Sequence, residues 1–376
     1  MKVLYFTNLP VPYRMDFFNQ LGKLCNLTVW VETEKRKKSN SAWLKRNKAE
    51  NFKFKALKKF EISDSKYINY GYARQLKKEK FDIVVVGTYY STSAMLFIET
   101  LRMLKIPYIL NSDGGFIRPD SKVKKLIKQH FIKGAVAYLS TGRLTDQYLE
   151  YYGAPKEKIY HYPFTSVHEK EVLSEVPTKD LKQKLRDKLG MKERVIYVSV
   201  GSCIRRKGYD ILLEACKNLE SDKGFYLIGG KSTDDQLENL KHFVIEYNLT
   251  NVHFIEFLDK NELKEYYMAA DAFVLPTRED VWGLVINEAA AHALPIITTD
   301  QCIAGTELVI DGKTGYLIST ENTTDLIKAI ESIGNDMGSI RDEMSANILK
   351  TAKKYTIEKM AQCHLDVFNA VKYNKN

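Results

Sequence analysis

Cysteine is scarce in this sequence of 376 residues, and its spacing carries no pattern. The five cysteines are spread from Cys25 to Cys363 without a Cys-x-x-Cys pair, so the sequence predicts neither a disulfide framework nor a structural zinc site. The seven histidines also lack metal-ligand spacing. This cysteine usage favours a reducing, cytoplasmic setting.

Long hydrophobic runs are missing as well. No apolar run approaches the roughly 20 residues that a membrane-spanning helix requires. Residues 1–6 are typical of a first strand rather than of a signal peptide, because no long apolar segment follows the charge at Lys2. We therefore expect a soluble protein, or one that binds a membrane peripherally.

Acidic residues are fewer than basic ones, 47 against 57, which gives a net charge of +10. The excess is concentrated between Lys35 and Lys59, where eleven Lys and Arg residues stand against the single acid Glu50, with Trp43 and other apolar residues interleaved. Such a segment suits an anionic lipid surface, a solvated loop or a nucleic acid. Nucleic acid is the least favoured of the three.

Hydrophobic residues make up 44% of the chain, and short apolar segments alternate with amphipathic ones. This alternation is typical of parallel sheets with crossover helices. In the first half, strands are predicted at 3–7, 27–31, 83–86, 108–110 and 136–139, and helices at 14–24, 91–105, 121–132 and 143–152. In the second half, strands are predicted at 195–200, 225–228, 252–255, 272–275 and 296–298, and helices at 209–219, 236–247, 263–270 and 284–292.

The alternation restarts once, which predicts two Rossmann-like α/β domains with doubly wound parallel sheets. We place the first at 1–165, a Pro- and charge-containing connection at 166–192, the second domain at 193–355 and a C-terminal helix within 356–376. Ligands bind at the carboxyl ends of the strands in such sheets, so a cleft between the two domains is expected.

One strand–loop–helix segment in the second half carries most of the functional information. The strand ends at Leu275, a loop containing Asp280 follows, and a helix begins near Gly283 with Glu288 in its second turn. Free amides and the helix dipole at such a start bind anions. Carboxylates there accept hydrogen bonds from sugar hydroxyls rather than bind phosphate.

The run Asp280-Val-Trp-Gly-Leu-Val-Ile-Asn-Glu288 resembles the motif of retaining GT-B glycosyltransferases of glycosyltransferase family 4, also called glycosyl transferases group 1. The resemblance implies that Asp280 binds hydroxyls of the transferred sugar and Glu288 the ribose. The amides of Gly283, Leu284 and Val285 would bind diphosphate.

Two departures from the family pattern leave alternatives open, one at Asp280 and the other at Ser202, where the family commonly has Arg. The family usually has Glu at the position of Asp280, and Glu279 stands just before it, so either carboxylate could contact the sugar. A second block, from Val198 to Ala215, is similar to the family's strand, glycine and basic loop, with Gly201 and Lys207 in matching positions. Lys207 supplies one cation for the diphosphate, and Arg205 or Arg206 the second.

In the first half, Asp113 precedes the pair Gly114-Gly115, which permits close backbone approach to a sugar. Relatives place a histidine in this loop. Asp113 could hydrogen-bond a donor hydroxyl or the acceptor, or it could cap its own turn.

Downstream, residues 121–133 contain apolar side chains at helical spacing and five lysines. This pattern is typical of an interfacial helix on anionic lipid. It is equally typical of a helix whose apolar stripe packs on the sheet.

The resemblance implies a retaining transfer of a hexose from a UDP-sugar, or less favoured a GDP-sugar, to a glycan or lipid-linked acceptor in polysaccharide biosynthesis. Lys207, Asp280 and Asp113 would be the catalytic residues. No Asp-x-Asp occurs, so no metal or other cofactor is expected. We expect the protein in the cytoplasm, with peripheral binding to the inner membrane face as an added expectation. The alternatives are a sugar-nucleotide epimerase or hydrolase of the same fold and, in another class, a nucleic-acid-binding protein.

Overall fold

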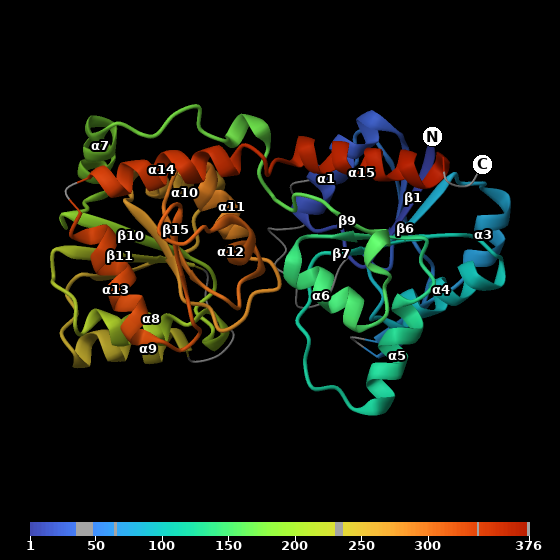
Figure 1. The fold of residues 1–376 in the computed structure, drawn as a ribbon, viewed down its shortest axis with the longest axis horizontal. Helices are drawn as coiled ribbons and strands as arrows, with labels where there is room; N and C mark the ends of the chain where they lie inside the picture. The colour runs from blue at the N-terminus through green and yellow to red at the C-terminus, as the bar shows by residue number, and fades with distance from the viewer. Residues whose placement is uncertain (35–47, 64–65, 230–235, 337, 374–376) are drawn as a thin grey trace. The chain divides into compact units, whose positions relative to one another are not determined.

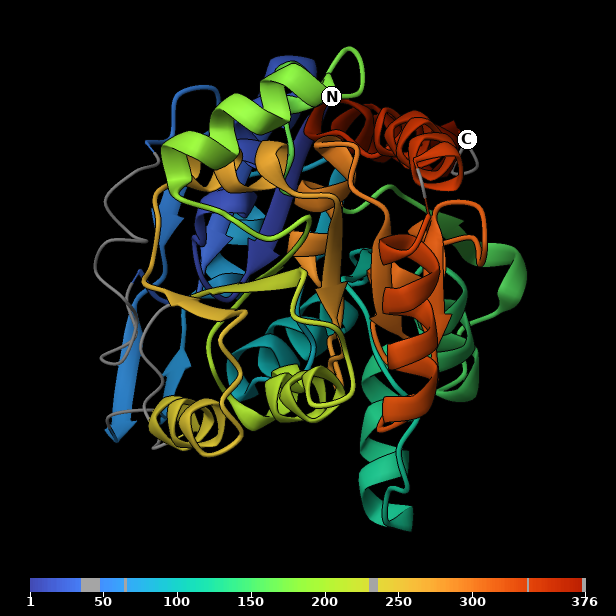
Figure 2. The same ribbon diagram turned by 90° about the vertical axis from the view of Figure 1, so that its left-hand side faces the viewer.

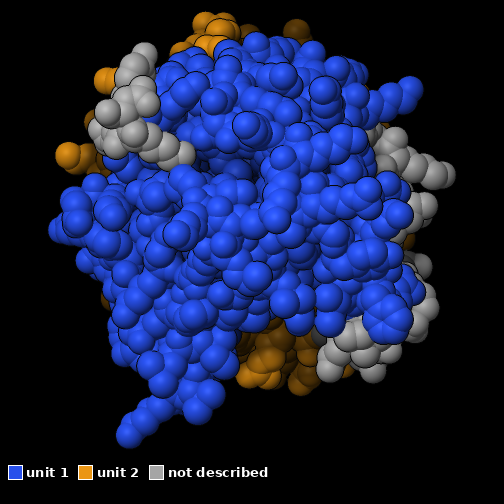
Figure 3. All heavy atoms as spheres, turned by 90° about the vertical axis from the view of Figure 1, so that its right-hand side faces the viewer, with its two compact units in different colours: residues 1–166, 356–376 blue, residues 167–355 orange. Residues whose placement is uncertain are grey.

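The computed structural model describes residues 1–34, 48–63, 66–229, 236–336 and 338–373. The chain forms two compact units, residues 1–166 with 356–376, and residues 167–355, which are coloured separately in Figure 3. Each unit is built on one fully parallel sheet with helices packed against it (Figure 1). The predicted α/β fold with two doubly wound parallel sheets is confirmed.

The sheet of unit 1 contains every strand predicted for the first half, with bounds shifted by at most two residues. In sheet order its strands are β3 (Lys53–Ala56), β2 (Asn26–Val31), β1 (Lys2–Thr7), β6 (Ile83–Val86), β7 (Ile109–Ser112), β8 (Ala137–Ser140) and β9 (Ile159–His161). Its helices are α1 (Pro12–Leu24), α3 (Tyr72–Lys78), α4 (Thr92–Met103), α5 (Lys122–Ile132), α6 (Arg143–Tyr151) and α15 (Ile357–Tyr373).

Part of the basic segment is regular structure rather than loop. Residues 53–56 form β3, which pairs in parallel with β2 at the edge of the sheet, and β4 (Lys59–Ser63) pairs with β5 (Lys66–Asn69) in an antiparallel hairpin. The edge strand alternates lysines with apolar residues, and Lys55 Nζ donates to Gln75 Oε1 at 2.8 Å. Charged side chains are common on edge strands, where they discourage pairing with other chains. Residues 35–47 of the segment lie outside the described residues.

The C-terminal helix belongs to unit 1 although it follows unit 2 in the chain. Helix α15 packs along α1, with the buried ring of His364 lying 4.7 Å from Phe17 and 4.7 Å from Tyr162, measured between ring centroids. The sequence predicts this helix but not the unit it joins. None of the helices within the described residues has the length and hydropathy needed to cross a bilayer.

The sheet of unit 2 contains all five predicted strands and one more. Its order is β12 (Val252–Ile255), β11 (Lys223–Ile228), β10 (Val195–Val200), β13 (Ala272–Leu275), β14 (Ile296–Thr299) and β15 (Gly315–Ile318). Its helices are α7 (Lys179–Leu189), α8 (Tyr209–Cys216), α9 (Gln236–Glu246), α10 (Lys260–Ala269), α11 (Leu284–Ala291), α12 (Ile303–Leu308), α13 (Thr323–Gly334) and α14 (Ser339–Ala352).

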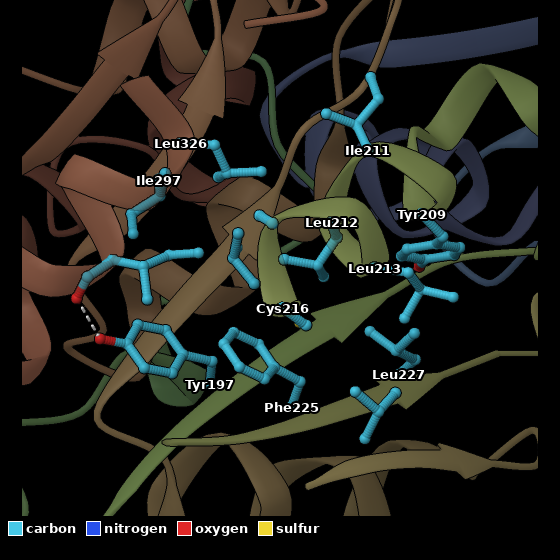
Figure 4. Packing of buried hydrophobic residues seen from close by; sticks show 14 of the residues in the cluster. Tyr197, Tyr209, Ile211, Leu212, Leu213, Cys216, Phe225, Leu227, Ile297 and Leu326 are labelled. Atoms are coloured by element: carbon cyan, nitrogen blue, oxygen red, sulfur yellow. Dashed lines mark hydrogen bonds between the residues drawn. The ribbon is translucent and has the colours of Figure 1, made fainter. Parts of the chain in front are cut away.

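The core of unit 2 lies between its sheet and the helices α8 and α13 (Figure 4). Tyr197 of β10 stacks on Phe225 of β11 with ring centroids 5.2 Å apart, and the Tyr197 hydroxyl donates to the carbonyl of Ile330 at 2.6 Å. Both faces of a parallel sheet are covered, so its strands are almost continuously apolar, which makes them recognisable in the sequence.

Residues 167–192, which lie within the predicted connection 166–192, group with unit 2 and include α7. The helix begins after Thr178, whose hydroxyl accepts from the Leu181 amide at 3.2 Å, and ends at Gly190, which has a left-handed φ of 70°. These are a preferred N-cap and a preferred C-terminal residue. Seven of the 11 residues of α7 are charged, so its hydrophobic pattern is too weak to show that it packs on the unit.

A buried ion cluster fixes α7 to unit 2. The carboxylate of Asp271, whose side chain is 6% exposed, lies 2.6 Å from Arg186 Nη2 and 3.6 Å from Lys182 Nζ, and it accepts from the Ile196 amide. Burial alone would raise the pKa of Asp271, but the charges of Lys182, Arg186 and Arg341 outweigh burial and hold the pKa below its ordinary value. Asp271 is therefore charged at neutral pH, and its contribution to stability is lost only as the pH falls through this lowered pKa.

Replacing Asp271 with alanine is expected to lower the free energy of unfolding by about 3–5 kcal/mol, because it leaves buried cations without their counter-charge. Urea unfolding at pH 7 measures the loss. Glu265→Ala is the matched control, since that carboxylate is 35% exposed beside Lys188 of α7 and exposed pairs contribute about 1 kcal/mol or less. Equal losses in the two variants would contradict the assignment.

Candidate functional site

Two loops of unit 2 meet beyond the carboxyl ends of the adjacent strands β10 and β13. The first runs from Gly201 to Gly208, and the second from Pro276 to Gly283. Gly208 makes this contact possible, because it has a φ of 74° and a Cβ there would lie 1.9 Å from the Pro276 carbonyl oxygen. Sheet topology thus brings together residues that are about 70 positions apart in the sequence.

The predicted residues Lys207 and Asp280 form an ion pair between these loops. Lys207 Nζ lies 2.6 Å from Asp280 Oδ2, and the two side chains are only 11% and 14% exposed. Gly201 allows this position of the lysine, because its φ is 154° and a Cβ there would lie 3.2 Å from Lys207 Cε. The lysine is therefore held across the end of β10 instead of extending into solvent.

Of the two arginines left open by the sequence, Arg206 is the one at this pair. Its Nη1 lies 3.3 Å from Asp280 Oδ1 and donates to the Glu279 carbonyl at 2.6 Å. Arg205 is exposed, and its carbonyl accepts from Arg278 at 2.6 Å. Two cations and one carboxylate therefore meet at this point, which leaves a net positive charge for an anion.

Asp280, rather than Glu279, presents its carboxylate to these cations. The Asp280 amide donates to the Gln301 carbonyl at 2.8 Å, and the Asp280 carbonyl accepts from Ile303 at 3.2 Å. The backbone of the residue is thereby fixed between two segments. Glu279 contributes its main-chain carbonyl, which accepts from Arg206 and from the Thr277 hydroxyl.

Helix α11 begins at the same loop. Gly283 has a φ of 98°, and a Cβ there would lie 2.8 Å from Cys302 Sγ, so the turn requires glycine. The amides of Leu284 and Val285 precede the first residue that can bond back within the helix, so they are donors for a ligand. With the dipole of the helix, they form an anion-binding turn beside Asp280.

Glu288 lies on α11, half-buried, more than one turn beyond Gly283. The Tyr267 hydroxyl donates to Glu288 Oε2 at 3.3 Å, and His292 Nδ1 donates to the Glu288 carbonyl at 2.8 Å. Tyr267 also stacks on His292 at 5.1 Å between centroids. Burial, followed by the charge of Glu288, raises the pKa of Tyr267 well above its ordinary value, so this hydroxyl remains a donor. The sequence does not show that Tyr267 orients the carboxylate.

In unit 1, Asp113 lies just beyond β7 and is held by side chains from distant segments. It forms an ion pair with Arg14 of α1 and accepts from Asn111 Nδ2 at 2.8 Å and from the Tyr162 hydroxyl at 2.8 Å. These partners favour a positioned carboxylate over an aspartate that merely caps its own turn. The sequence gives no sign of Arg14 or Tyr162 in this role.

The C-terminal helix supports the same loop through His364. His364 Nε2 lies 3.1 Å from Asn111 Oδ1, and Nδ1 donates to the Met360 carbonyl at 2.8 Å. Burial lowers the pKa of His364 to about 4, so the ring is neutral at physiological pH. Asn111, which lies in β7 and donates to Asp113, is therefore contacted by α15.

No group of three or more His, Cys, Asp or Glu side chains within the described residues is arranged to hold a metal ion. What the second unit offers to a ligand is a set of cations, helix amides and two oriented carboxylates, Asp280 and Glu288. The cations and the amides can bind a diphosphate, and the carboxylates can accept hydrogen bonds from hydroxyl groups.

Comparison with known proteins shows that part of this chain is similar to glycosyltransferases. Residues 182–355 match the family described as Glycosyl transferases group 1. An uncharacterized glycosyltransferase of Methanocaldococcus jannaschii is 32% identical over 161 residues, a match that spans 43% of this chain and 44% of the archaeal protein. An uncharacterized 41.2 kDa protein in the cps region of Klebsiella pneumoniae is 25% identical over 269 residues, covering 69% of this chain and 71% of that protein.

The fold is similar along the whole chain to that of solved structures. The crystal structure of Anabaena HepE in complex with UDP superposes with a TM-score of 0.79 at 15% identity, covering 98% of this chain and 100% of HepE. The chain therefore has the GT-B fold of glycosyltransferases. Its second unit contains the segment that matches the group 1 family.

Proposed function

We propose that the protein is a retaining glycosyltransferase that moves a hexose from a nucleotide sugar to a hydroxyl of a glycan or lipid-linked acceptor. The observation that carries the proposal is the meeting of Lys207, Arg206 and Asp280 with the first turn of α11 at one edge of the sheet. The cations and amides would bind a diphosphate, and the carboxylate would accept hydrogen bonds from the hydroxyls of a sugar. UDP is favoured over GDP because HepE, which shares the fold, was solved with UDP.

Each residue of the site has a distinct role in the proposed reaction. Lys207, Arg206 and the amides of Leu284 and Val285 neutralise the diphosphate as it leaves, while Glu288 accepts hydrogen bonds from the ribose. Asp280 accepts from hydroxyls of the sugar. As the bond between the anomeric carbon and the phosphate oxygen breaks, the acceptor oxygen bonds to that carbon from the same face, and its proton passes to the leaving phosphate oxygen.

The proposal also covers a residue of unit 1 that would contact the donor sugar or the acceptor, and the place of the reaction in the cell. Asp113 accepts a hydrogen bond from a hydroxyl of the donor sugar or of the acceptor, with its carboxylate fixed by Arg14 and Tyr162. The product belongs to polysaccharide biosynthesis in the cytoplasm. These assignments rest on the residues and on the family resemblance.

A thermal-shift screen of UDP- and GDP-sugars tests the donor site. A bound donor should raise the melting temperature, because a ligand at 100 times its Kd adds about 2.7 kcal/mol to the free energy of unfolding. Glu288→Ala should remove most of the shift, whereas Glu343→Ala, at an exposed position of α14, should leave it unchanged. The proposed site is wrong if the wild-type chain responds to no nucleotide sugar or if both variants respond alike.

The same preparations distinguish the alternatives. An epimerase or a hydrolase would convert the donor without an acceptor, whereas a transferase requires both. A nucleic-acid-binding protein would lose affinity steeply with salt and would be unaffected by Glu288→Ala. Turnover of donor alone, at the rate seen with acceptor, would contradict transfer.

Transfer is expected to proceed unchanged after treatment with EDTA. The charge of the leaving diphosphate is met by Lys207, Arg206 and the α11 amides, so the proposed mechanism requires no divalent ion. Initial rates with EDTA, and again after adding back Mg²⁺ or Mn²⁺, check this. A rate that falls at least tenfold with EDTA and recovers with metal would disprove metal independence.

A further inference from the structure

Helix α5 of unit 1 exposes an apolar stripe that no other part of the described chain covers. The stripe consists of Val123, Leu126 and Ile127, which are 68%, 64% and 44% exposed. These positions lie on one face of the helix, because they are three and four residues apart. Helix α5 extends away from the sheet of unit 1 in Figures 1 and 2, and this end of the unit forms the projection at the lower left of Figure 3.

The sequence leaves open whether the apolar stripe of α5 packs on the sheet or faces outward, and the orientation of the helix decides this. Lys124 and Lys128 both lie 2.8 Å from the carboxylate of Asp120, and they lower its pKa. Lys125 Nζ lies 4.0 Å from the centroid of the Tyr151 ring. Several lysines thus attach the helix to the unit, and the apolar stripe faces outward instead of packing on the sheet. Of the α5 residues, only Ile132 is fully buried.

The charged side chains of the helix itself have one sign. Residues 121–133 contain five lysines and no aspartate or glutamate. Lys122 and Lys133, at the two ends of the helix, are exposed. An outward aliphatic stripe bordered by cations is complementary to a surface that is anionic outside and apolar beneath.

We propose that α5 binds the surface of an anionic lipid bilayer, with the stripe inserted at the boundary between headgroups and acyl chains and the lysines beside lipid phosphates. A nucleic acid would use the lysines but leave the stripe in water. A fluid bilayer accommodates three aliphatic side chains without a shaped pocket. This inference goes beyond the proposed reaction and does not depend on the nucleotide chemistry of unit 2.

Co-sedimentation of the full chain with vesicles tests the proposal. We expect binding to vesicles of phosphatidylcholine with one quarter phosphatidylglycerol, weak binding to pure phosphatidylcholine, and loss of binding in 0.5 M NaCl, where exposed charges are screened. Replacing all three stripe residues with serine should lower the partition coefficient at least tenfold. Lys122→Gln should lower it about fivefold, because a lysine near such a surface contributes about 1 kcal/mol.

A matched control comes from α9 of unit 2, where Ile245 is 76% exposed without a comparable lysine pattern. Ile245→Ser should leave vesicle binding unchanged, and the melting-temperature shift with a UDP-sugar should persist in the triple serine variant. Equal binding to neutral and anionic vesicles, or full binding by the triple variant, would overturn the proposal. So would self-association of the wild type that the triple variant abolishes while vesicle binding is absent.

Discussion

Replacing Lys207 with methionine is expected to lower the rate of sugar transfer by about 100- to 1,000-fold, the usual loss when one preorganised stabilising group is removed from a developing anion. Methionine keeps most of the side-chain stem in its nearly buried place and removes only the ammonium. The leaving diphosphate then loses the cation that is fixed beside Asp280. Steady-state release of UDP in the presence of acceptor measures the rate, and the melting temperature of the variant shows whether the fold is retained.

Two companion variants separate charge from structure. Asp280→Asn removes a negative charge next to the phosphate site, so UDP should bind about fivefold more tightly, as expected for about 1 kcal/mol of repulsion, while transfer falls because the sugar contact is weakened. Lys217→Met, beyond the other end of α8, breaks a pair with Glu214 and should change neither property. Wild-type transfer by Lys207→Met, or weaker UDP binding by Asp280→Asn, would contradict the proposed roles.

The donor segment could be predicted from the sequence because its features are local. A buried strand, a loop and a helix start follow one another from Ala272 to Glu288, and glycine is required at Gly283 by a left-handed backbone. Local order of this kind is visible in a single stretch of chain. The five strands predicted in each half were recognisable for a similar reason, since buried parallel strands are almost continuously apolar. The sheets also contain β3, β9 and β15, which the sequence did not predict.

Pairing between distant segments could not be predicted in the same way. The position of Arg206 beside Asp280 follows from the orientation of the short turn Arg205–Lys207 against the loop that carries Asp280. Tyr267 reaches Glu288 from α10, on another element. Strand β3 and helix α7 have so few apolar residues that charge dominates their pattern, and tertiary contacts such as the Asp271 cluster determine their structure instead.

Replacing Asp113 with asparagine is expected to lower kcat by about 10- to 100-fold while leaving the affinity for UDP unchanged. Asparagine is nearly isosteric but lacks the charge, and a hydrogen bond to a charged group contributes about 1.5–3 kcal/mol. The residues proposed to bind UDP lie in unit 2, whereas Asp113 and its partner Arg14 lie in unit 1. Transfer kinetics and UDP titration on the same preparation therefore separate the two functions.

The neighbouring strand supplies the control for this prediction. Asp146 lies in the first turn of α6, the helix after β8, and is also 21% exposed, like Asp113. Its carboxylate is bonded to Ser140 and His161 and has no assigned role in transfer. Asp146→Asn should keep wild-type kcat. Loss of the Arg14 pair could destabilise unit 1, so the assay is run well below the melting temperature of Asp113→Asn. Wild-type kcat in a folded Asp113→Asn variant would make this carboxylate a purely structural counter-ion of Arg14.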